Sequence, residues 1–210
     1  TNSSKQMATI EGGVLTTNGG DGANILRMLR DHGRAADCDE ATRKRLAEAL
    51  KVDPFREKFT FHLPGFNVRG TDLQARLGLS QLARFDEALA VRARNHSLYS
   101  ERFAGATGFR IQEPPKGSVV ASIGFGVLAA SKAHRVKITE ALQAKGIETR
   151  PVCAGNIARQ PFWTAAYGES KRERPIADAI HDRSFQLPNH ALLEPEDVGF
   201  ISETVLAVTP

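Results

Sequence analysis

The stretch VVASIGFGVLAASKAHRVKITEALQAKGIETRPV, residues 119–152, decides the fold class. Its first part, residues 119–128, is β-branched and apolar and predicts a buried strand. Ser131 is a good N-cap for the helix that follows, and Gly146 is a residue type that commonly ends helices. Residues 147–152 then alternate as in a second strand. Strands that alternate with helices predict an α/β protein.

The first part of the chain predicts a strand followed by helices. Residues 14–17 are β-prone and precede an Asn-Gly-Gly turn, so we expect a short strand there. Apolar residues at helical spacing begin after the capping residue Asp21 and stop at Gly33. Residues 34–58 are charged and helical at best over residues 41–50, which predicts a mobile surface segment.

The middle of the chain predicts one long helix. Thr71 and Gln74 have the Thr-x-x-Gln spacing of a capping box. Good helix formers and an apolar stripe continue from there toward Phe103 without a breaker. A terminal helix is expected from Pro195, where a first-position proline precedes two acidic residues. We expect a domain boundary inside or just after the long helix.

Composition excludes several classes of protein. The 28 Lys and Arg residues and 24 Asp and Glu residues are interleaved, and the net charge is only +4, so no nucleic-acid partner is expected. No apolar run approaches the length of a membrane span. Cys38 and Cys153 lack the spacing of a metal knuckle or redox pair, which predicts two free thiols, no metal site and a cytoplasmic location. The chain opens as mid-domain sequence without a signal peptide, so an upstream portion is expected.

Four ordered segments carry a resemblance to a known family. In SKQMATIEGGVLTTN, residues 4–18, Lys5 precedes the Glu of Glu-Gly-Gly by six residues. The other three are GFNVRGTDLQARLGLSQL (65–82), GIETRPVCAGNIARQP (146–161) and LPNHALLEPEDVGFI (187–201). Together they resemble the DegT/DnrJ/EryC1/StrS family of nucleotide-sugar aminotransferases, which depend on pyridoxal 5'-phosphate (PLP). The resemblance implies fold type I of the PLP-dependent transferases.

This resemblance also implies a domain organisation and a set of site residues. Residues 1–103 would be the C-terminal part of the large PLP-binding domain with the connecting helix, and residues 104–210 the small α+β domain. Lys5 would be the catalytic residue, holding the cofactor through its amine and then moving the substrate proton. Asn67 would bind the cofactor phosphate of the neighbouring subunit in a homodimer. The alternative for Asn67 is a turn cap after the Pro-Gly pair that precedes it.

Three further polar residues are candidates for substrate binding. Arg150, Asn156 and Arg159 lie in the segment that is typical of one branch of the family, and guanidinium groups match the geometry of a diphosphate. Surface charge explains the arginines equally well. His32 also has two open interpretations, as an active-site residue or as a simple helix end.

The function implied is transfer of an amino group to a nucleotide-linked keto-deoxy sugar, with glutamate as the donor. One alternative is a PLP-dependent 3-dehydratase, because the segment 146–161 is similar to that branch. Those enzymes carry His where Lys5 stands, and we therefore favour transamination. The other alternative is an inactive fragment or dimerisation module, because the family's Asp for the cofactor ring, its stacking aromatic residue and its first phosphate loop lie upstream of the lysine.

Overall fold

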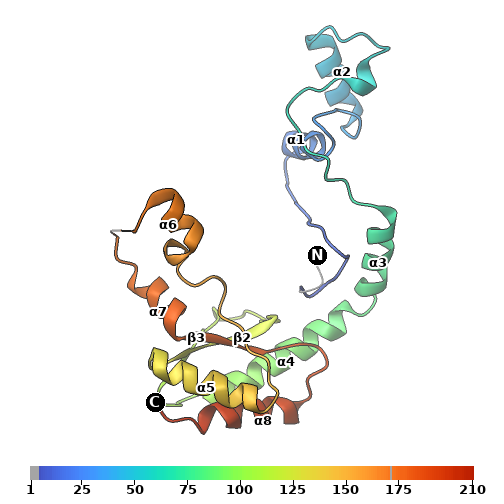
Figure 1. Ribbon diagram of the computed structural model, residues 1–210. Helices are drawn as coiled ribbons and strands as arrows, with labels where there is room; N and C mark the ends of the chain where they lie inside the picture. Colours follow the sequence, from blue (N-terminus) through green and yellow to red (C-terminus); the bar gives the residue numbers. More distant parts are fainter. Residues whose placement is uncertain (1–4, 171) are drawn as a thin grey trace. The chain divides into compact units, whose positions relative to one another are not determined.

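The computed structural model describes residues 5–170 and 172–210 (Figure 1). The chain divides into two compact units, the first ending at Leu82 and the second beginning at Ala83. Each unit has its own group of buried apolar side chains. The first unit contains α1 (Gly20–Arg30), α2 (Glu40–Ala49), the short 3-10 helix η1 (Glu57–Phe59) and α3 (Asp72–Leu82).

A polar network joins α1 to α2 in the first unit. The amide of Asn24 is buried and donates to Asp39 Oδ2 at 2.5 Å and to Thr42 Oγ1 at 2.9 Å. Asp39 is also the N-cap of α2, because its Oδ1 accepts the backbone N–H of Thr42 at 2.8 Å. Met28 and Cys38 are buried close by, with Leu46 and Leu63 packed around them in part. The helical stretch expected within residues 41–50 is thereby confirmed as α2.

Two expectations for the first half of the chain are wrong. Residues 14–17 form no strand, and the side chains of Val14 and Leu15 are 77% and 78% exposed. The long helix is two helices, because α3 ends at Leu82 and α4 begins at Phe85. Arg84 between them has φ −118° and ψ 8°, which is outside the helical region. The predicted capping box at the start of α3 is confirmed.

The second unit is built around a three-stranded antiparallel sheet in the order β1-β2-β3. Its register pairs Phe109 with Ala129 and Phe125 with Leu187. Its elements are α4 (Phe85–Phe103), β1 (Phe109–Ile111), β2 (Gly124–Ala129), α5 (Lys132–Ala144), η2 (Ile157–Arg159), α6 (Pro161–Tyr167), α7 (Pro175–Arg183), β3 (Ser184–Pro188) and α8 (Pro195–Leu206).

The main core lies between this sheet and the helices α4, α5 and α8, which gather on one side of the strands in Figure 1. Alternate residues of β2, such as Phe125 and Val127, are buried, as expected for a strand with one covered face. Tyr99 of α4 is fully buried, stacks on the Phe125 ring at 4.9 Å and donates its hydroxyl proton to the Pro188 carbonyl at 3.0 Å. This packing confirms a folded apolar core in the second half.

The stretch 119–152 is confirmed in part. The strand occupies only Gly124–Ala129, and α5 begins after the cap Ser131, whose hydroxyl accepts the N–H of His134 at 3.1 Å. Residues 147–152 do not form the second strand. They make one isolated bridge, between Arg150 and Gln186 of β3, and Pro151 then supplies no N–H to continue the pairing.

Candidate cofactor and substrate site

The Lys5 segment lies against α3 in the first unit. Gln74 on the first turn of α3 donates its side-chain amide to the Glu11 carbonyl at 2.7 Å. A Cβ at Gly78 would lie 3.1 Å from Thr9 Cγ2, so the Lys5 segment and α3 are in close contact there as well. Lys5 itself is exposed. The structure therefore joins the first two family-like segments, through residues that are 63 positions apart in the sequence.

Asn67 lies on a loop that packs on the end of α1. Phe66 accepts from the N–H of His32 at 2.7 Å and donates to the Leu29 carbonyl at 2.7 Å, and Asn67 is paired with Asp31 in an isolated antiparallel bridge. The approach is so close that a Cβ at Gly65 would lie 2.1 Å from the Gly33 nitrogen. These backbone contacts fix the position of Asn67, and Asn67 itself is exposed.

A buried carboxylate lies beside Asn67 and was not expected from the sequence. Asp31 is 3% exposed, and its carboxylate accepts two hydrogen bonds from Arg34, at 2.7 and 2.9 Å. Arg69 Nε lies 3.3 Å and His32 Nε2 lies 3.9 Å from the same carboxylate. The Arg34 hydrogen bonds lower the pKa of Asp31 from its ordinary value. The one sign of this ion pair in the sequence was the spacing of Asp31 and Arg34, which are three residues apart at the end of a helix.

The three candidate substrate residues lie in the second unit, on the segment 150–160. Arg150 is exposed and donates through Nε to Glu148 at 3.0 Å. Asn156 is only 5% exposed, and its side chain is fully engaged within the protein. Arg159 forms a two-pronged pair with the Asp182 carboxylate, at 2.9 and 3.1 Å. The structure brings Asn156 and Arg159 together, while Arg150 lies apart from their contacts. Their substrate role stays a prediction.

The Arg159 pair changes the acidity of both partners. The hydrogen bond to Asp182 raises the pKa of Arg159, and the same bond lowers the pKa of Asp182. Both groups are therefore charged at neutral pH. Asp178 and Asp182 were missed from the sequence, although the spacing of four residues places them on one face of α7.

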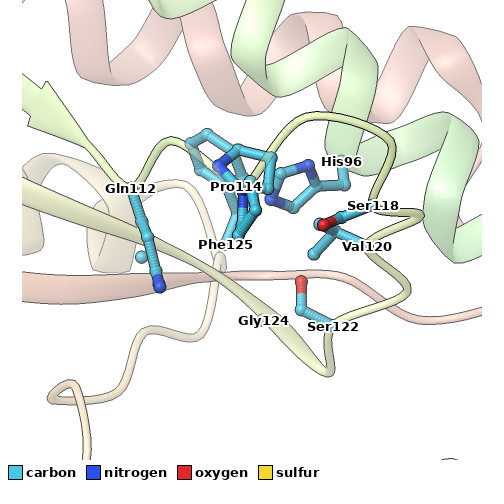
Figure 2. Close-up of a pocket in the computed structure, with 10 residues that line it drawn as sticks. His96, Gln112, Pro114, Ser118, Val120, Ser122, Gly124 and Phe125 are labelled. Atoms are coloured by element: carbon cyan, nitrogen blue, oxygen red, sulfur yellow. The ribbon is translucent and has the colours of Figure 1, made fainter.

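A cavity of about 250 Å³ lies elsewhere in the second unit and contains none of the expected site residues (Figure 2). Its walls carry neutral polar groups from His96, Gln112, Ser118 and Ser122, with Phe125 beside the imidazole at 5.1 Å between ring centroids. Burial lowers the pKa of His96, which favours the neutral ring. This cavity can accept hydrogen bonds and donate them, but it offers no charged group to a phosphate.

Over residues 5–170 and 172–210, no cluster of three His, Cys, Asp or Glu side chains could bind a metal ion. Within the same described ranges, no helix has both the length and the apolar character needed to cross a bilayer.

The arrangement fits part of a PLP site. An exposed lysine amine on the Lys5 segment can react with the cofactor aldehyde, and an exposed amide such as that of Asn67 can donate to a phosphate oxygen. Both residues belong to the first unit. An exposed amine and an exposed amide are thus available for the predicted tether and phosphate donor, two of the several contacts that such a cofactor needs.

The sequence is similar to those of several known proteins over most of its length. The chain is 30% identical over 200 residues to the lipopolysaccharide biosynthesis protein RfbH of Salmonella typhimurium, a match that covers 91% of this chain and 46% of that protein. It is 32% identical to the GDP-perosamine synthase of Caulobacter vibrioides, over 92% of this chain and 47% of the synthase. The GDP-4-keto-6-deoxy-D-mannose 3-dehydratase of Yersinia pseudotuberculosis is 29% identical over 74% of this chain and 39% of that enzyme.

Solved structures show the same fold. An Escherichia coli GDP-4-keto-6-deoxy-D-mannose-3-dehydratase with bound hydrated PLP matches 96% of this chain and 52% of that chain, with a TM-score of 0.78 and 22% identity. The Helicobacter pylori aminotransferase PseC matches 97% of this chain and 50% of that chain, with a TM-score of 0.76 and 24% identity. These likenesses confirm the expected α/β class and fold type I of the PLP-dependent transferases.

The chain spans about half the length of the curated relatives it matches. The sequence model of the DegT/DnrJ/EryC1/StrS aminotransferase family matches residues 2–206, nearly the whole chain. This chain belongs to the DegT/DnrJ/EryC1/StrS aminotransferase family.

Proposed function

We propose that this chain is part of a PLP-dependent aminotransferase that acts on a nucleotide-linked keto-deoxy sugar, with glutamate as amino donor. The observation that carries the proposal is Lys5, an exposed primary amine at the family's spacing before Glu11. The family match and the relation to a GDP-perosamine synthase support it. In keeping with the family resemblance, we also propose a homodimer in the cytoplasm.

The residues of this chain would act as follows. Lys5 would hold the cofactor through Nζ and, as a free amine, would take a proton from the substrate carbon and return it at Nζ. PLP, when bound, supplies an electron sink for the carbanion at the substrate carbon. Asn67 donates its amide to the cofactor phosphate across the dimer interface, and the backbone contacts of Phe66 keep it in position. Arg150, Asn156 and Arg159 belong to the segment proposed to recognise the sugar nucleotide.

A 3-dehydratase is the second candidate, and one observation favours it. The Yersinia 3-dehydratase is 29% identical to this chain, nearly as similar as the aminotransferase relatives. The segment 146–161 also resembles that branch. The residue at position 5 argues against it, because a lysine amine can bond to the cofactor whereas the His found in the dehydratases cannot.

Spectroscopy of the purified protein with PLP tests the cofactor role of Lys5. We expect a visible absorption band that Lys5→Ala abolishes and that the exposed-lysine control Lys116→Ala retains. Borohydride reduction followed by peptide mass analysis should then locate the cofactor on Lys5. Absence of the band in the unaltered protein would instead support an inactive fragment.

Product analysis separates the two reactions. With a nucleotide-linked 4-keto-6-deoxy sugar and glutamate, transamination yields one amino sugar and one 2-oxoglutarate per turnover. Loss of the 3-hydroxyl group without gain of nitrogen would refute the aminotransferase and support the dehydratase.

A further inference from the structure

The segment 150–160 is held in its conformation by α7. Gly155 has a positive φ of 63°, and a Cβ there would lie 2.7 Å from Nδ1 and 2.8 Å from Cα of His181. Such distances leave no room for any side chain. The backbone of the segment therefore rests directly on the imidazole of α7.

One hydrogen bond in this contact depends on the protonation of His181. The backbone N–H of Asn156 donates to His181 Nδ1 at 3.2 Å. A neutral imidazole has one nitrogen with a free lone pair, whereas a protonated imidazole carries a hydrogen on both nitrogens. The bond therefore requires neutral His181 with its proton on Nε2. Protonation would place an Nδ1–H donor of His181 opposite the N–H donor of Asn156, which is buried.

Two carboxylates complete the attachment of the segment to α7. Asn156 Nδ2 donates to Asp178 Oδ1 at 2.8 Å, and Asn156 Oδ1 accepts the N–H of Ala158 at 3.0 Å. Arg159 pairs with Asp182 and also approaches Asp178 Oδ1 at 3.4 Å. Every polar group of the Asn156 side chain is thus used to shape the segment, so its role is to position its neighbours.

We propose that Asp178, His181 and Asp182 of α7 are positioning residues for the segment 150–160, and that His181 holds it only as a neutral imidazole. The substrate consequence rests on the proposed function, because that function makes this segment part of the sugar-nucleotide site. Protonation of His181 would then loosen the segment and weaken sugar binding.

The charged groups around His181 are consistent with this behaviour. Asp178 and Asp182 lie on α7, the helix that carries His181, and Arg159 of the segment forms ion pairs with both carboxylates. Lys132 of α5 interacts electrostatically with Asp182. The two carboxylates are already engaged by Arg159 and Asn156. Protonation of His181 would cost the Asn156 hydrogen bond, while the charged ring would interact favourably with the nearby Asp182 carboxylate.

Hydrogen exchange of the Asn156 and Ala158 amides tests the attachment in the whole protein, independently of any activity. We expect His181→Leu to accelerate exchange on the order of tenfold at neutral pH, because a buried N–H loses its acceptor. In the unaltered protein, exchange divided by the intrinsic rate should rise as the pH is lowered, because protonation of the imidazole removes the acceptor at Nδ1. Unchanged exchange in His181→Leu would overturn the proposal.

His181→Asn is the conservative variant that separates chemistry from packing. The asparagine side-chain oxygen can replace the Nδ1 acceptor, and an amide does not take up a proton on mild acidification. We expect exchange within threefold of the unaltered protein at neutral pH and no acceleration on acidification. Acceleration with acid in this variant as large as in the unaltered protein would remove His181 from the explanation, even if His181→Leu failed to fold.

A pair of glycine variants tests the close contact separately. Gly155→Ala and Gly168→Ala both introduce a side chain at a positive φ. A Cβ at Gly155 would meet His181 within 3 Å, whereas a Cβ at Gly168 would meet no described atom within 4 Å. Gly155→Ala should accelerate Asn156 exchange and Gly168→Ala should not. Equal effects would mean that the acceleration reports backbone strain alone.

A comparison of the two half-reactions tests whether the attachment of the segment to α7 affects binding of the sugar nucleotide. His181→Leu should raise the KM for the sugar nucleotide on the order of tenfold while the spectral change caused by glutamate stays within twofold. An equal loss in both halves would indicate a general structural defect and refute positioning. If glutamate changes no spectrum in the unaltered protein, the proposed function fails, and the exchange experiments still decide whether His181 holds the segment.

Discussion

Replacing Gly65 by alanine should detach the Asn67 loop from the end of α1. The new Cβ would lie 2.1 Å from the Gly33 nitrogen and 2.5 Å from the His32 carbonyl carbon. Favourable contacts between heavy atoms require about 3.5–4.0 Å, so the two backbones must separate by more than about 1 Å. Both neighbours are backbone atoms, and neither can rotate away as a side chain would.

The cost follows from the hydrogen bonds that such a separation breaks. Three are at stake: His32 N–H to the Phe66 carbonyl at 2.7 Å, Phe66 N–H to the Leu29 carbonyl at 2.7 Å, and Val68 N–H to the Arg30 carbonyl at 3.1 Å. Each contributes about 0.5–1.5 kcal/mol, so we expect the free energy of unfolding to fall by about 2–4 kcal/mol.

Denaturant unfolding and amide exchange measure this effect, with Gly70→Ala as the matched control. A Cβ at Gly70 would meet only Gln74 Oε1, at 4.0 Å, on the same exposed segment. The amides of Phe66 and Val68 should exchange faster in Gly65→Ala alone, and the affinity for PLP should fall if Asn67 binds the phosphate. A difference of less than about 0.5 kcal/mol between the two variants would refute the contact.

Three other results are expected. Tyr99→Phe should lower the free energy of unfolding by about 1–2 kcal/mol in denaturant melts, because a buried carbonyl at the end of β3 loses its donor at 3.0 Å. In the native protein a thiol reagent should modify the exposed Cys153 and spare the buried Cys38, whose pKa is raised by burial; modification of both at one rate would contradict this. Because the Arg159 hydrogen bond depresses the pKa of Asp182 below its unfolded value, its stabilisation is present above that value and is lost as the pH falls through the folded pKa. NMR titration of the carboxyl should show the depressed pKa, and Arg159→Met should raise the pKa of Asp182 toward that of an ordinary aspartate.

The parts of the fold that local chemistry decides were predictable. The Thr71 and Gln74 pair forms reciprocal hydrogen bonds at the start of α3, at 2.9 and 3.3 Å, as its spacing indicated. Ser131 caps α5, and α8 begins at Pro195. These features depend on residues within one helical turn, so one sequence contains all of the information.

The errors concern features that depend on distant partners. Residues 14–17 have a β-prone sequence, but a strand also needs a neighbour to pair with, and none pairs with them among the described residues. The break before Phe85 has no Gly or Pro to mark it, and the acidic pair Asp86 and Glu87 was the one local sign of a new helix start.

The candidate site was predictable only as a set of residue types. Lys5 and Asn67 were predicted from ordered motifs, and the structure adds the hydrogen bonds that hold their segments. Asn156 and Arg159 illustrate the limit, because a sequence shows a polar group without showing which partner has already engaged it. The carboxylates of Asp178 and Asp182, 20 or more residues away, are those partners.

The bridge between Arg150 and Gln186 also affects solubility. Because the sheet order is β1-β2-β3, one side of β3 would otherwise present unpaired backbone groups to other molecules. Reciprocal backbone hydrogen bonds between Arg150 and Gln186, at 2.6 and 3.4 Å, cover part of that edge. A change that breaks this bridge would uncover a template for strand addition, and such variants should aggregate at lower protein concentration than the unaltered protein.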